Sequence, residues 1–327
     1  MLTNTTIHGH KALWMENDLI KVGVLPEKGA DIYEFIHKPS GVQFLMKTPE
    51  GLRPPGRQPP VDFLENYEGA WQELFPNHNE ACQVDGASIP FHGEVATRAW
   101  NYEVLEAGEE ETAIRINVQV RCLPFRLERV MRIWRGSTSL ELEGTVTNLS
   151  DKPQPFVWGQ HITLGGDFLE EGCKLELPAK TIYTPEVIFE AATARLQEAQ
   201  CQPWPMATGR KMGEQIDLSY IPGPQVHSHD DAYLTGLEQG TWSVSNLHLG
   251  LKFVLNWEAT VFPWVVLWQP YGGVDLPPLT GIYGVGIEPW VARYPLAQAI
   301  EHGQARWLQG RETLSTKLNA SVEVVEK

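Results

Sequence analysis

The sequence predicts an all-β protein with a sandwich or another large β architecture. Several segments alternate strictly between apolar and polar residues, as strands with one buried face do. Three or more such strands follow one another with no helical pattern between them. No fixed-period repeat, low-complexity tract or change in composition marks a linker, so residues 1–327 are expected to form a single domain.

Two short strands are expected near the N-terminus. Residues 19–25 and 32–36 are strongly apolar, and a compact Pro-Glu-Lys-Gly turn at 26–29 separates them. The segment from Pro49 to Pro60 contains five prolines and two glycines, which excludes a helix interior or a central strand. This segment is either an ordered loop beside a site or a solvated connection.

The clearest strands lie in the middle of the chain. Alternation starts at Thr112, and the apolar members share one parity: Ile114, Ile116, Val118, Val120 and Cys122. The same pattern recurs at Leu140, Leu142 and Val146. Residues 148–153 then form a turn into a strand at 156–158, which is expected to deliver His161 to a break at Gly165 and Gly166.

The rest of the chain continues this architecture. A short helix is expected at 191–200, although its apolar face is thin. Residues 247–257 alternate, and 262–268 form another apolar strand. The last strand carries its apolar face on Leu314, Thr316, Leu318, Ala320, Val322 and Val324.

Composition limits the classes of partner and compartment. The net charge of −15 repels phosphate backbones and anionic lipid headgroups, so neither nucleic acid nor a membrane surface is an expected partner. The four cysteines form no CxxC pair, which argues against a zinc knuckle or redox motif and favours thiols in a reducing compartment. The N-terminus has no basic and apolar leader pattern, and no later stretch reaches about 18 apolar residues. A cytoplasmic protein is expected.

Three residues are candidates for acid–base chemistry. His161 and His92 each have a glycine nearby, which leaves room for a ligand to approach, and imidazole titrates near neutral pH. Glu288 lies on an apolar strand that is expected to end at Pro289, and burial there would raise the pKa of its carboxyl group toward neutrality. Each residue taken alone has an equally ordinary structural role.

Taken together and in order, three segments resemble the aldose 1-epimerase (galactose mutarotase) family. They are PFHGEV around His92, WGQHITLGGDF around His161, and VGIEPW around Glu288 followed by WLQGRETLSTKL. The resemblance implies a large antiparallel β-sandwich with a sugar in an open cleft across one sheet. It also implies that Glu288 is the general base at the anomeric hydroxyl, His161 the general acid at the ring oxygen, and His92 an assisting sugar ligand.

The chain departs from the family pattern at several positions. Glu94 follows His92-Gly93 where galactose mutarotases usually have a second glycine, and the upstream segment FPNHNEA has Asn77 but no arginine. Residues 162–164 replace aromatics that commonly follow the second histidine. These differences indicate a divergent branch of the superfamily.

Further residues are expected to bind the sugar: Asn77, Arg98, Gln160, Asp231 and Trp268. Asp230 is an equal claimant for the role of Asp231, because either carboxylate accepts two hydrogen bonds from adjacent hydroxyls. His227 and His229 with these two aspartates resemble a metal cluster, but spacing ties no further ligand to them, so no metal is predicted. No cofactor is expected, because a carboxylate and a histidine supply both proton transfers.

Three alternatives stay open at this level. The same cleft suits a non-catalytic carbohydrate-binding or sensing protein. A lyase or glycoside hydrolase would need two carboxylates, with Asp231 or Glu94 beside Glu288. A sugar-phosphate epimerase would need cations near the cleft, for which the candidates are Arg53, Arg57, Arg98 and Arg293. A monomer or a homodimer is expected.

Overall fold

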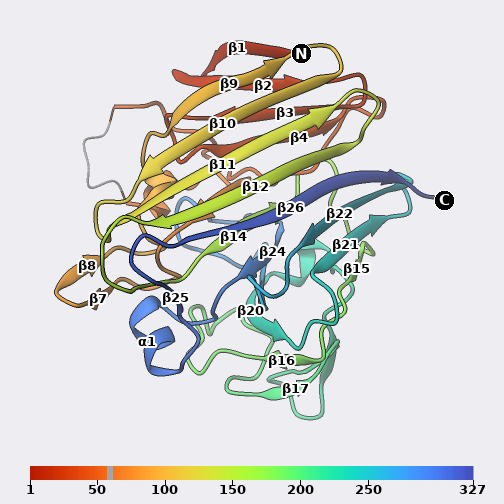
Figure 1. The fold of residues 1–327 in the computed structure, drawn as a ribbon. Coiled ribbons are helices and arrows are strands. Elements are labelled where there is room, and N and C mark those ends of the chain that lie inside the picture. Colours follow the sequence, from red (N-terminus) through yellow and green to blue (C-terminus); the bar gives the residue numbers. More distant parts are fainter. Residues whose placement is uncertain (57–61, 327) are drawn as a thin grey trace.

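Two large antiparallel sheets pack face to face and form a β-sandwich (Figure 1). The structure is a computed structural model and describes residues 1–56 and 62–326. The twelve-stranded sheet has the order β1-β2-β3-β4-β6-β14-β24-β23-β20-β16-β17, with β5 paired to β4. Its strands are β1 (Leu2–Ile7), β2 (His10–Glu16), β3 (Ile20–Leu25), β4 (Asp31–His37), β5 (Val42–Gln43), β6 (Trp71–Leu74), β14 (Gly159–Leu164), β16 (Thr181–Tyr183), β17 (Cys201–Pro203), β20 (Ser228–Thr235), β23 (Trp264–Tyr271) and β24 (Val285–Trp290).

The second sheet has eight strands in the order β15-β21-β22-β26-β12-β11-β10-β9. They are β9 (Asn101–Ala107), β10 (Glu111–Gln119), β11 (Phe125–Trp134), β12 (Ser139–Asn148), β15 (Lys174–Glu176), β21 (Thr241–Asn246), β22 (Leu251–Trp257) and β26 (Thr313–Val324). Three small pairs and four short helices complete the described elements: β7 (Cys82–Val84) with β8 (Ala87–Ile89), β13 (Gln154–Phe156) with β25 (Arg306–Leu308), β18 (Met206–Thr208) with β19 (Gln215–Asp217), η1 (Leu64–Asn66), η2 (Val95–Thr97), η3 (Pro224–Val226) and α1 (Leu296–Glu301).

The main core lies between the two sheets. Phe35 of β4 and Phe253 of β22 come from opposite sheets, and their ring centroids lie 5.2 Å apart. Phe44 and Phe168 extend this cluster, with centroids 4.6 Å apart. Burying these rings stabilises the sandwich by removing large apolar surfaces from water. The alternation expected from the sequence therefore reflects one face turned toward this core.

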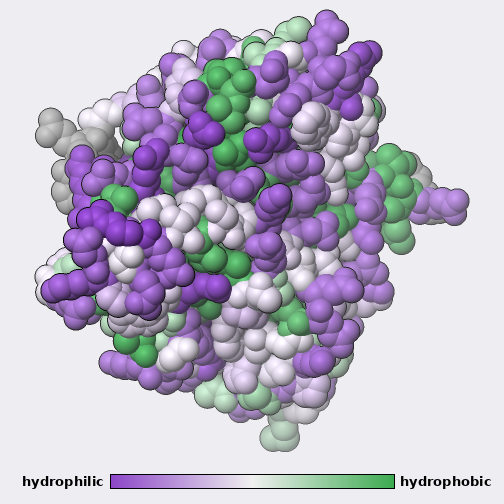
Figure 2. Space-filling view, viewed as in Figure 1, coloured by the Kyte–Doolittle hydropathy of each residue, from purple (hydrophilic) through white to green (hydrophobic). Residues whose placement is uncertain are grey.

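The two sheets differ on their outer faces. In β12, residues that are buried alternate with residues that meet solvent. The face of the molecule that carries this sheet is mostly hydrophilic, with small separate hydrophobic groups (Figure 2). In β14 and β24, by contrast, every residue is buried, because loops cover the outer face of the twelve-stranded sheet. A ligand cavity can form between the outer face of a sheet and the loops that cover it.

The structure corrects several local expectations. The strand expected at 156–158 is broken, because β13 ends at Phe156 and β14 begins at Gly159, so His161 lies inside a strand and not at its end. The strand carrying Glu288 continues through Pro289, which faces Val265 in the β23–β24 pair. The β10 strand ends at Gln119, before Val120 and Cys122.

The expected helix at 191–200 is wrong, and a helix exists elsewhere. The backbone N–H groups of Arg195 and Leu196 donate to Oδ1 of Asp230, which satisfies them outside any helix. Leu196 is also the one buried apolar side chain of this run, too little for a helix face. The observed helix α1 buries Leu296 and Ala299.

The C-terminal strands differ only at their ends. β22 begins at Leu251, because the residues before it form the turn from β21. Val324 ends β26 and is 77% exposed, so the apolar face expected there stops at Val322. The free thiols of all four cysteines fit the absence of a CxxC pair. Among the described residues, no helix is both long and apolar enough to cross a bilayer.

Candidate active site

A cavity of about 240 Å³ lies on the outer face of the twelve-stranded sheet. Strand β14 contributes His161 to its floor, β24 contributes Glu288, and β20 and β23 contribute Asp231 and Trp268. The neighbouring residue Gln160 points the other way, into the space between the sheets, because successive side chains of a strand face opposite sides. The sheet thus displays its acid–base groups on one face while its other face packs in the core.

Strand pairing brings His161 and Glu288 together although 127 residues separate them. In the β14–β24 pair, Gly159 faces Trp290 and Thr163 faces Gly286, which places His161 midway between, opposite Glu288. Nε2 of His161 lies 3.5 Å from Oε1 of Glu288. The two groups are therefore held within reach of one small ligand.

Burial shifts the pKa values of both members of this pair. It lowers the pKa of His161 to about 4, and it raises the pKa of Glu288 well above its ordinary value. Desolvation disfavours the charged form of each group, which is the cause in both cases. At neutral pH the imidazole of His161 is therefore uncharged, and burial favours the protonated form of the Glu288 carboxyl group beside it.

Two glycines make room for the Glu288 carboxyl group. Nε1 of Trp290 donates to Oε2 of Glu288 over 2.9 Å, and a Cβ at Gly159 would collide with this indole ring. A Cβ at Gly286 would lie 2.6 Å from Oε1 of Glu288. Gly159 of the WGQH segment and Gly286 of VGIEPW are therefore steric requirements of one carboxylate position.

His92 approaches the same pair from a loop. Its backbone has a φ of 55°, and a Cβ on the following Gly93 would collide with the Phe75 carbonyl, so the loop is tightly packed. Nδ1 of His92 accepts a hydrogen bond from the Asn79 N–H over 3.0 Å, and burial lowers the pKa of His92 well below its ordinary value. This uncharged tautomer carries its proton on Nε2, which makes that atom a hydrogen-bond donor for a ligand.

Trp268 provides an aromatic surface beside the pair. Its ring centroid lies 5.5 Å from that of His161, and its Nε1 donates to Nε2 of His229 over 2.7 Å. The other nitrogen of His229 lies 3.0 Å from a carboxylate oxygen of Glu190. This chain of hydrogen bonds fixes the indole, and a fixed aromatic face can stack against the C–H face of a sugar.

Asp231 lies next to Trp268 and is the aspartate that faces the cavity. The two residues are cross-strand partners in the β20–β23 pair. Surrounding protein raises the pKa of Asp231, and the nearby Asp230 adds to this effect. Asp230 faces the other way, where its carboxylate pairs with Arg195 over 2.7 Å. Of the two aspartates, Asp231 is therefore the one placed to meet a ligand.

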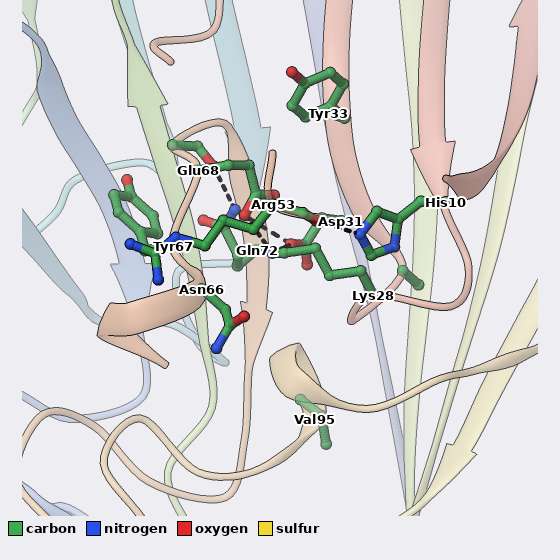
Figure 3. A network of polar contacts seen from close by, with 12 residues as sticks. His10, Lys28, Asp31, Tyr33, Arg53, Asn66, Tyr67, Glu68, Gln72 and Val95 are labelled. Carbon is green, nitrogen blue, oxygen red and sulfur yellow. Dashed lines mark hydrogen bonds and ion pairs between the residues drawn. The ribbon is translucent and has the colours of Figure 1, made fainter. Parts of the chain in front are cut away.

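The loop around η1 forms one wall of the cavity. Tyr67 is buried, its ring centroid lies 5.2 Å from that of His161, and its hydroxyl lies 3.0 Å from Oγ1 of Thr163. Behind this wall, Lys28 pairs with Asp31 over 2.6 Å and also with Glu68 (Figure 3). Because Glu68 follows Tyr67 in the chain, this buried network anchors the wall to the turn between β3 and β4.

Burial and charge within that network shift the pKa values of its own residues. Burial raises the pKa of Asp31 well above its ordinary value, although Lys28 opposes the shift. Burial alone would lower the pKa of Lys28, but Asp31 and Glu68 outweigh it and raise that pKa. Lys28 is therefore a fixed ammonium group committed to two carboxyl groups. It lines a separate cavity of about 120 Å³, together with His10 and Arg53.

Comparison with known proteins places the chain in a family. The model of a family described as a domain of unknown function (DUF4432) matches residues 7–322. The chain belongs to this family. No curated protein shows significant sequence similarity to it.

Solved structures show that this DUF4432 protein has the galactose mutarotase-like fold. A "putative aldose 1-epimerase" from Klebsiella pneumoniae matches with a TM-score of 0.77 and 17% identity, over 99% of this chain and 83% of that one. The Slr1438 protein from Synechocystis matches at 0.69 and 18% identity, over 98% and 99%. A galactose mutarotase-like protein from Lactobacillus casei matches at 0.65 and 14% identity, over 95% and 100%.

In this DUF4432 protein the cavity collects five of the eight residues expected at the site: His92, His161, Asp231, Trp268 and Glu288. Gln160 lies between the sheets, where its side chain bonds to Trp71 and Glu73. Arg98 lies outside the cavity, bonded to Glu94 and to the Gln119 carbonyl. The pairing of Arg98 with Glu94 also removes Glu94 as a second carboxylate at the site.

Asn77 is the third expected sugar ligand that lies outside the cavity. Its amide nitrogen donates to the carbonyls of Glu80 and Pro90, and its oxygen accepts from the N–H of Leu296. These bonds tie the loop before His78 to helix α1. The residue is therefore committed to main-chain groups, a role that its position in FPNHNEA does not reveal.

Other cavity residues were not among the sugar ligands expected from the sequence. His78 lies with its ring centroid 5.9 Å from that of His92, and burial lowers its pKa to about 3. His229 and Tyr233 share the strand face of Asp231, so the period of two in β20 is the signal that could have found them. His227 is exposed, and no group of three metal-ligating side chains occurs in the described part of the chain.

The arginines considered for a phosphate lie elsewhere. Arg53 pairs with Glu50 and lines the smaller cavity. Arg293 is surrounded by aromatic rings, with its guanidinium carbon 4.6 Å from the Tyr183 centroid. Arg57 and the end of the proline-rich segment lie outside the described residues. Within residues 1–56 and 62–326, no lysine or arginine lines the 240 Å³ cavity.

Proposed function

We propose that this protein is a cofactor-independent aldose 1-epimerase, a mutarotase that interconverts the α and β anomers of a sugar. The observation that carries the proposal is the buried contact between His161 and Glu288, whose Nε2 and Oε1 atoms lie 3.5 Å apart. Opening a hemiacetal requires one proton to leave the anomeric hydroxyl while another reaches the ring oxygen. A carboxylate and an imidazolium on one face of the sugar supply both transfers.

The reaction conserves protons throughout. In the reactive form a proton lies on His161 and the negative charge on Glu288, a form that differs from the uncharged pair by one proton transfer across the contact. Glu288 takes the O1 proton, His161 gives its proton to the ring oxygen, and the C1–O5 bond breaks. The aldehyde rotates about C1–C2, and ring closure with the reverse transfers gives the other anomer.

The remaining groups orient the sugar. The proton on Nε2 of His92 suits a hydrogen bond to an oxygen near the reacting centre, and Asp231 suits adjacent hydroxyls. The fixed indole of Trp268 suits the C–H face of the ring. Holding the substrate in the reactive geometry accounts for part of the rate enhancement in such a mechanism.

The free thiols of all four cysteines support our expectation of a cytoplasmic protein.

Saturation-transfer NMR of anomer exchange over a panel of free aldoses tests the proposal. Glu288→Gln keeps an oxygen that can accept from Trp290 but cannot take a proton, so we expect exchange to fall by roughly 10²- to 10⁴-fold. The matched control is Glu238→Gln, which changes a carboxyl group that is 66% exposed and pairs only at the surface with Lys180. Exchange at the wild-type rate in Glu288→Gln would refute the assignment of the base.

A second candidate function is a non-catalytic sugar-binding protein. Burial favours the uncharged forms of His161 and Glu288, and this supports the alternative because both groups can then hydrogen-bond a sugar without transferring a proton. Calorimetric binding of a sugar whose anomers exchange no faster with protein than without it would support this alternative. Acceleration of exchange by catalytic amounts of protein would exclude it.

A further inference from the structure

Three polar side chains around the cavity are already bonded to other parts of the protein. The indole N–H of Trp268 donates to His229, and the second ring nitrogen of His229 bonds to Glu190. The Tyr67 hydroxyl bonds to Thr163. These residues present ring surfaces to a ligand and not hydrogen-bonding atoms.

Several polar groups on the floor are open to a ligand: the His161–Glu288 pair, Nε2 of His92 and the carboxylate of Asp231. The reacting pair meets O1 and the ring oxygen, and the other two groups meet neighbouring hydroxyls. The side chains of Asn79, Glu80 and Tyr233 also line the cavity and can meet further hydroxyls. The floor therefore serves the reacting side of a pyranose.

Apolar side chains make up much of the walls. Phe63, Leu64 and Phe91 form one wall, which we call the inner wall. Three further apolar lining residues are exposed to water, and we call them the rim: Val187 is 84% exposed, Phe189 63% and Leu276 40%. Exposed apolar groups that line a cavity indicate an apolar partner, because water is a poor neighbour for them.

Charge narrows the ligand further. Glu80, Asp231 and Glu288 line the cavity, whereas no lysine or arginine of the described residues does. Phosphate and carboxylate groups are bound by clustered cations and are repelled by carboxylates. The lining therefore disfavours a sugar phosphate or an acidic sugar and suits an uncharged one.

We propose that the substrate is a neutral deoxy sugar, most simply a 6-deoxyhexose whose C6 methyl group packs against the apolar walls. This inference rests on the proposed mutarotase activity and specifies its substrate class. A hydroxyl at C6 that packs against these apolar side chains would lose its bonds to water there, whereas a methyl group in the same place removes apolar surface from water.

Matched sugar pairs test the inference. We would measure kcat/KM for anomer exchange by NMR on aldohexoses and their 6-deoxy counterparts, in the gluco, galacto and manno configurations and both enantiomeric series. The 6-phosphates and uronic acids of the same sugars complete the panel. We expect the deoxy member of the best pair to be preferred by at least about tenfold, the scale at which a hydrophobic pocket discriminates.

A variant of the rim links the preference to the structure. Leu276→Ser makes the rim polar, and we expect the deoxy preference to fall toward one. Its matched control is Leu247→Ser, a substitution of a 62% exposed leucine in the turn before β22 that does not line the cavity. We expect this control to keep both the rate and the preference of the wild type.

The outcomes separate this inference from the proposed function. Exchange accelerated equally for both members of each pair, or better for the hydroxylated member, would overturn the deoxy-sugar assignment and leave the mutarotase intact. Preference for a phosphate or uronic acid would overturn it in the same way. No acceleration for any sugar would reject the mutarotase itself and the substrate class with it.

Discussion

At the scale of single residues, the site depends on how burial divides a proton between two groups. In water the imidazole of His161 would be the more basic member of the pair, and the carboxyl of Glu288 the more acidic. Burial reverses this order by lowering the pKa of the histidine and raising that of the glutamate. Either arrangement of the proton leaves the pair with one acid and one base, which is what reversible ring opening needs.

These shifted pKa values predict the pH profile of the reaction. Below pH about 4, a second proton binds at His161 and the pair has no base; above the raised pKa of Glu288, the last proton leaves and the pair has no acid. We expect kcat/KM to fall on the acid side only near pH 4, and to fall on the alkaline side where Glu288 loses its proton, at a pH raised well above the ordinary carboxyl value. Rates without protein at each pH are the control, since acid and base also catalyse mutarotation. An acid limb near 6.5, the ordinary pKa of histidine, would contradict this assignment.

At the scale of elements, the paired strands β14 and β24 together position the His161 and Glu288 side chains. Their register sets His161 opposite Glu288, and the glycines at 159 and 286 provide the space that Trp290 and the carboxyl group occupy. Glycine is unfavourable inside a strand, because it has no side chain to pack and loses more backbone freedom than other residues. Its presence at both positions is explained by the close approach of these functional side chains.

The substitution Gly286→Ala tests whether the glycine sets the position of the Glu288 carboxyl group. The added Cβ would lie 2.6 Å from Oε1 of Glu288, so the carboxyl group must shift from its position beside His161. We expect exchange to slow by roughly 10- to 100-fold, because displacements of about 1 Å cost this much in an aligned site. Circular dichroism would check the fold, and Gly108→Ala in the turn between β9 and β10 is the control. A folded variant with unchanged kcat would show that the carboxyl position is not critical.

At the scale of the whole molecule, a buried polar network joins the two sheets. Arg129 of β11 donates to Glu73 of β6 over 3.0 Å, and both side chains are only 2% exposed. Trp158 and Gln160 donate to the second oxygen of Glu73. Since Gln160 precedes His161, this network fixes the inner side of the strand whose outer side carries the acid–base pair.

Removing one partner of this ion pair should destabilise the sandwich. Arg129→Met leaves the Glu73 carboxylate buried without its cation, and we expect the free energy of unfolding in urea to fall by about 3–5 kcal/mol. The control Arg135→Met breaks an exposed pair with Glu110, for which the expected loss is at most about 1 kcal/mol. The double variant Arg129→Met with Glu73→Gln should recover part of the loss. Equal stability of Arg129→Met and wild type would show that the pair is not structurally important.

The sequence by itself determined the class of fold and the chemical types at the site. A period of two is local information, so strands such as β10, β12 and β26 could be read from it, although their ends could not. The residue types of His92, His161 and Glu288 predicted a hydrogen-bond donor, an acid and a base, which are the roles proposed for them above. The helix expected at 191–200 failed because a side chain distant in sequence, Asp230, satisfies its backbone groups.

Only the tertiary structure decided which of these residues meet, and on which face. Gln160 and His161 are neighbours in sequence, as are Asp230 and Asp231, yet one of each pair faces the cavity and the other does not. A strand pattern with both faces buried carries no sign of which parity faces the ligand. That choice follows from the pairing of β14 with β24 and of β20 with β23, and long-range pairing is set by the packing of the whole sandwich.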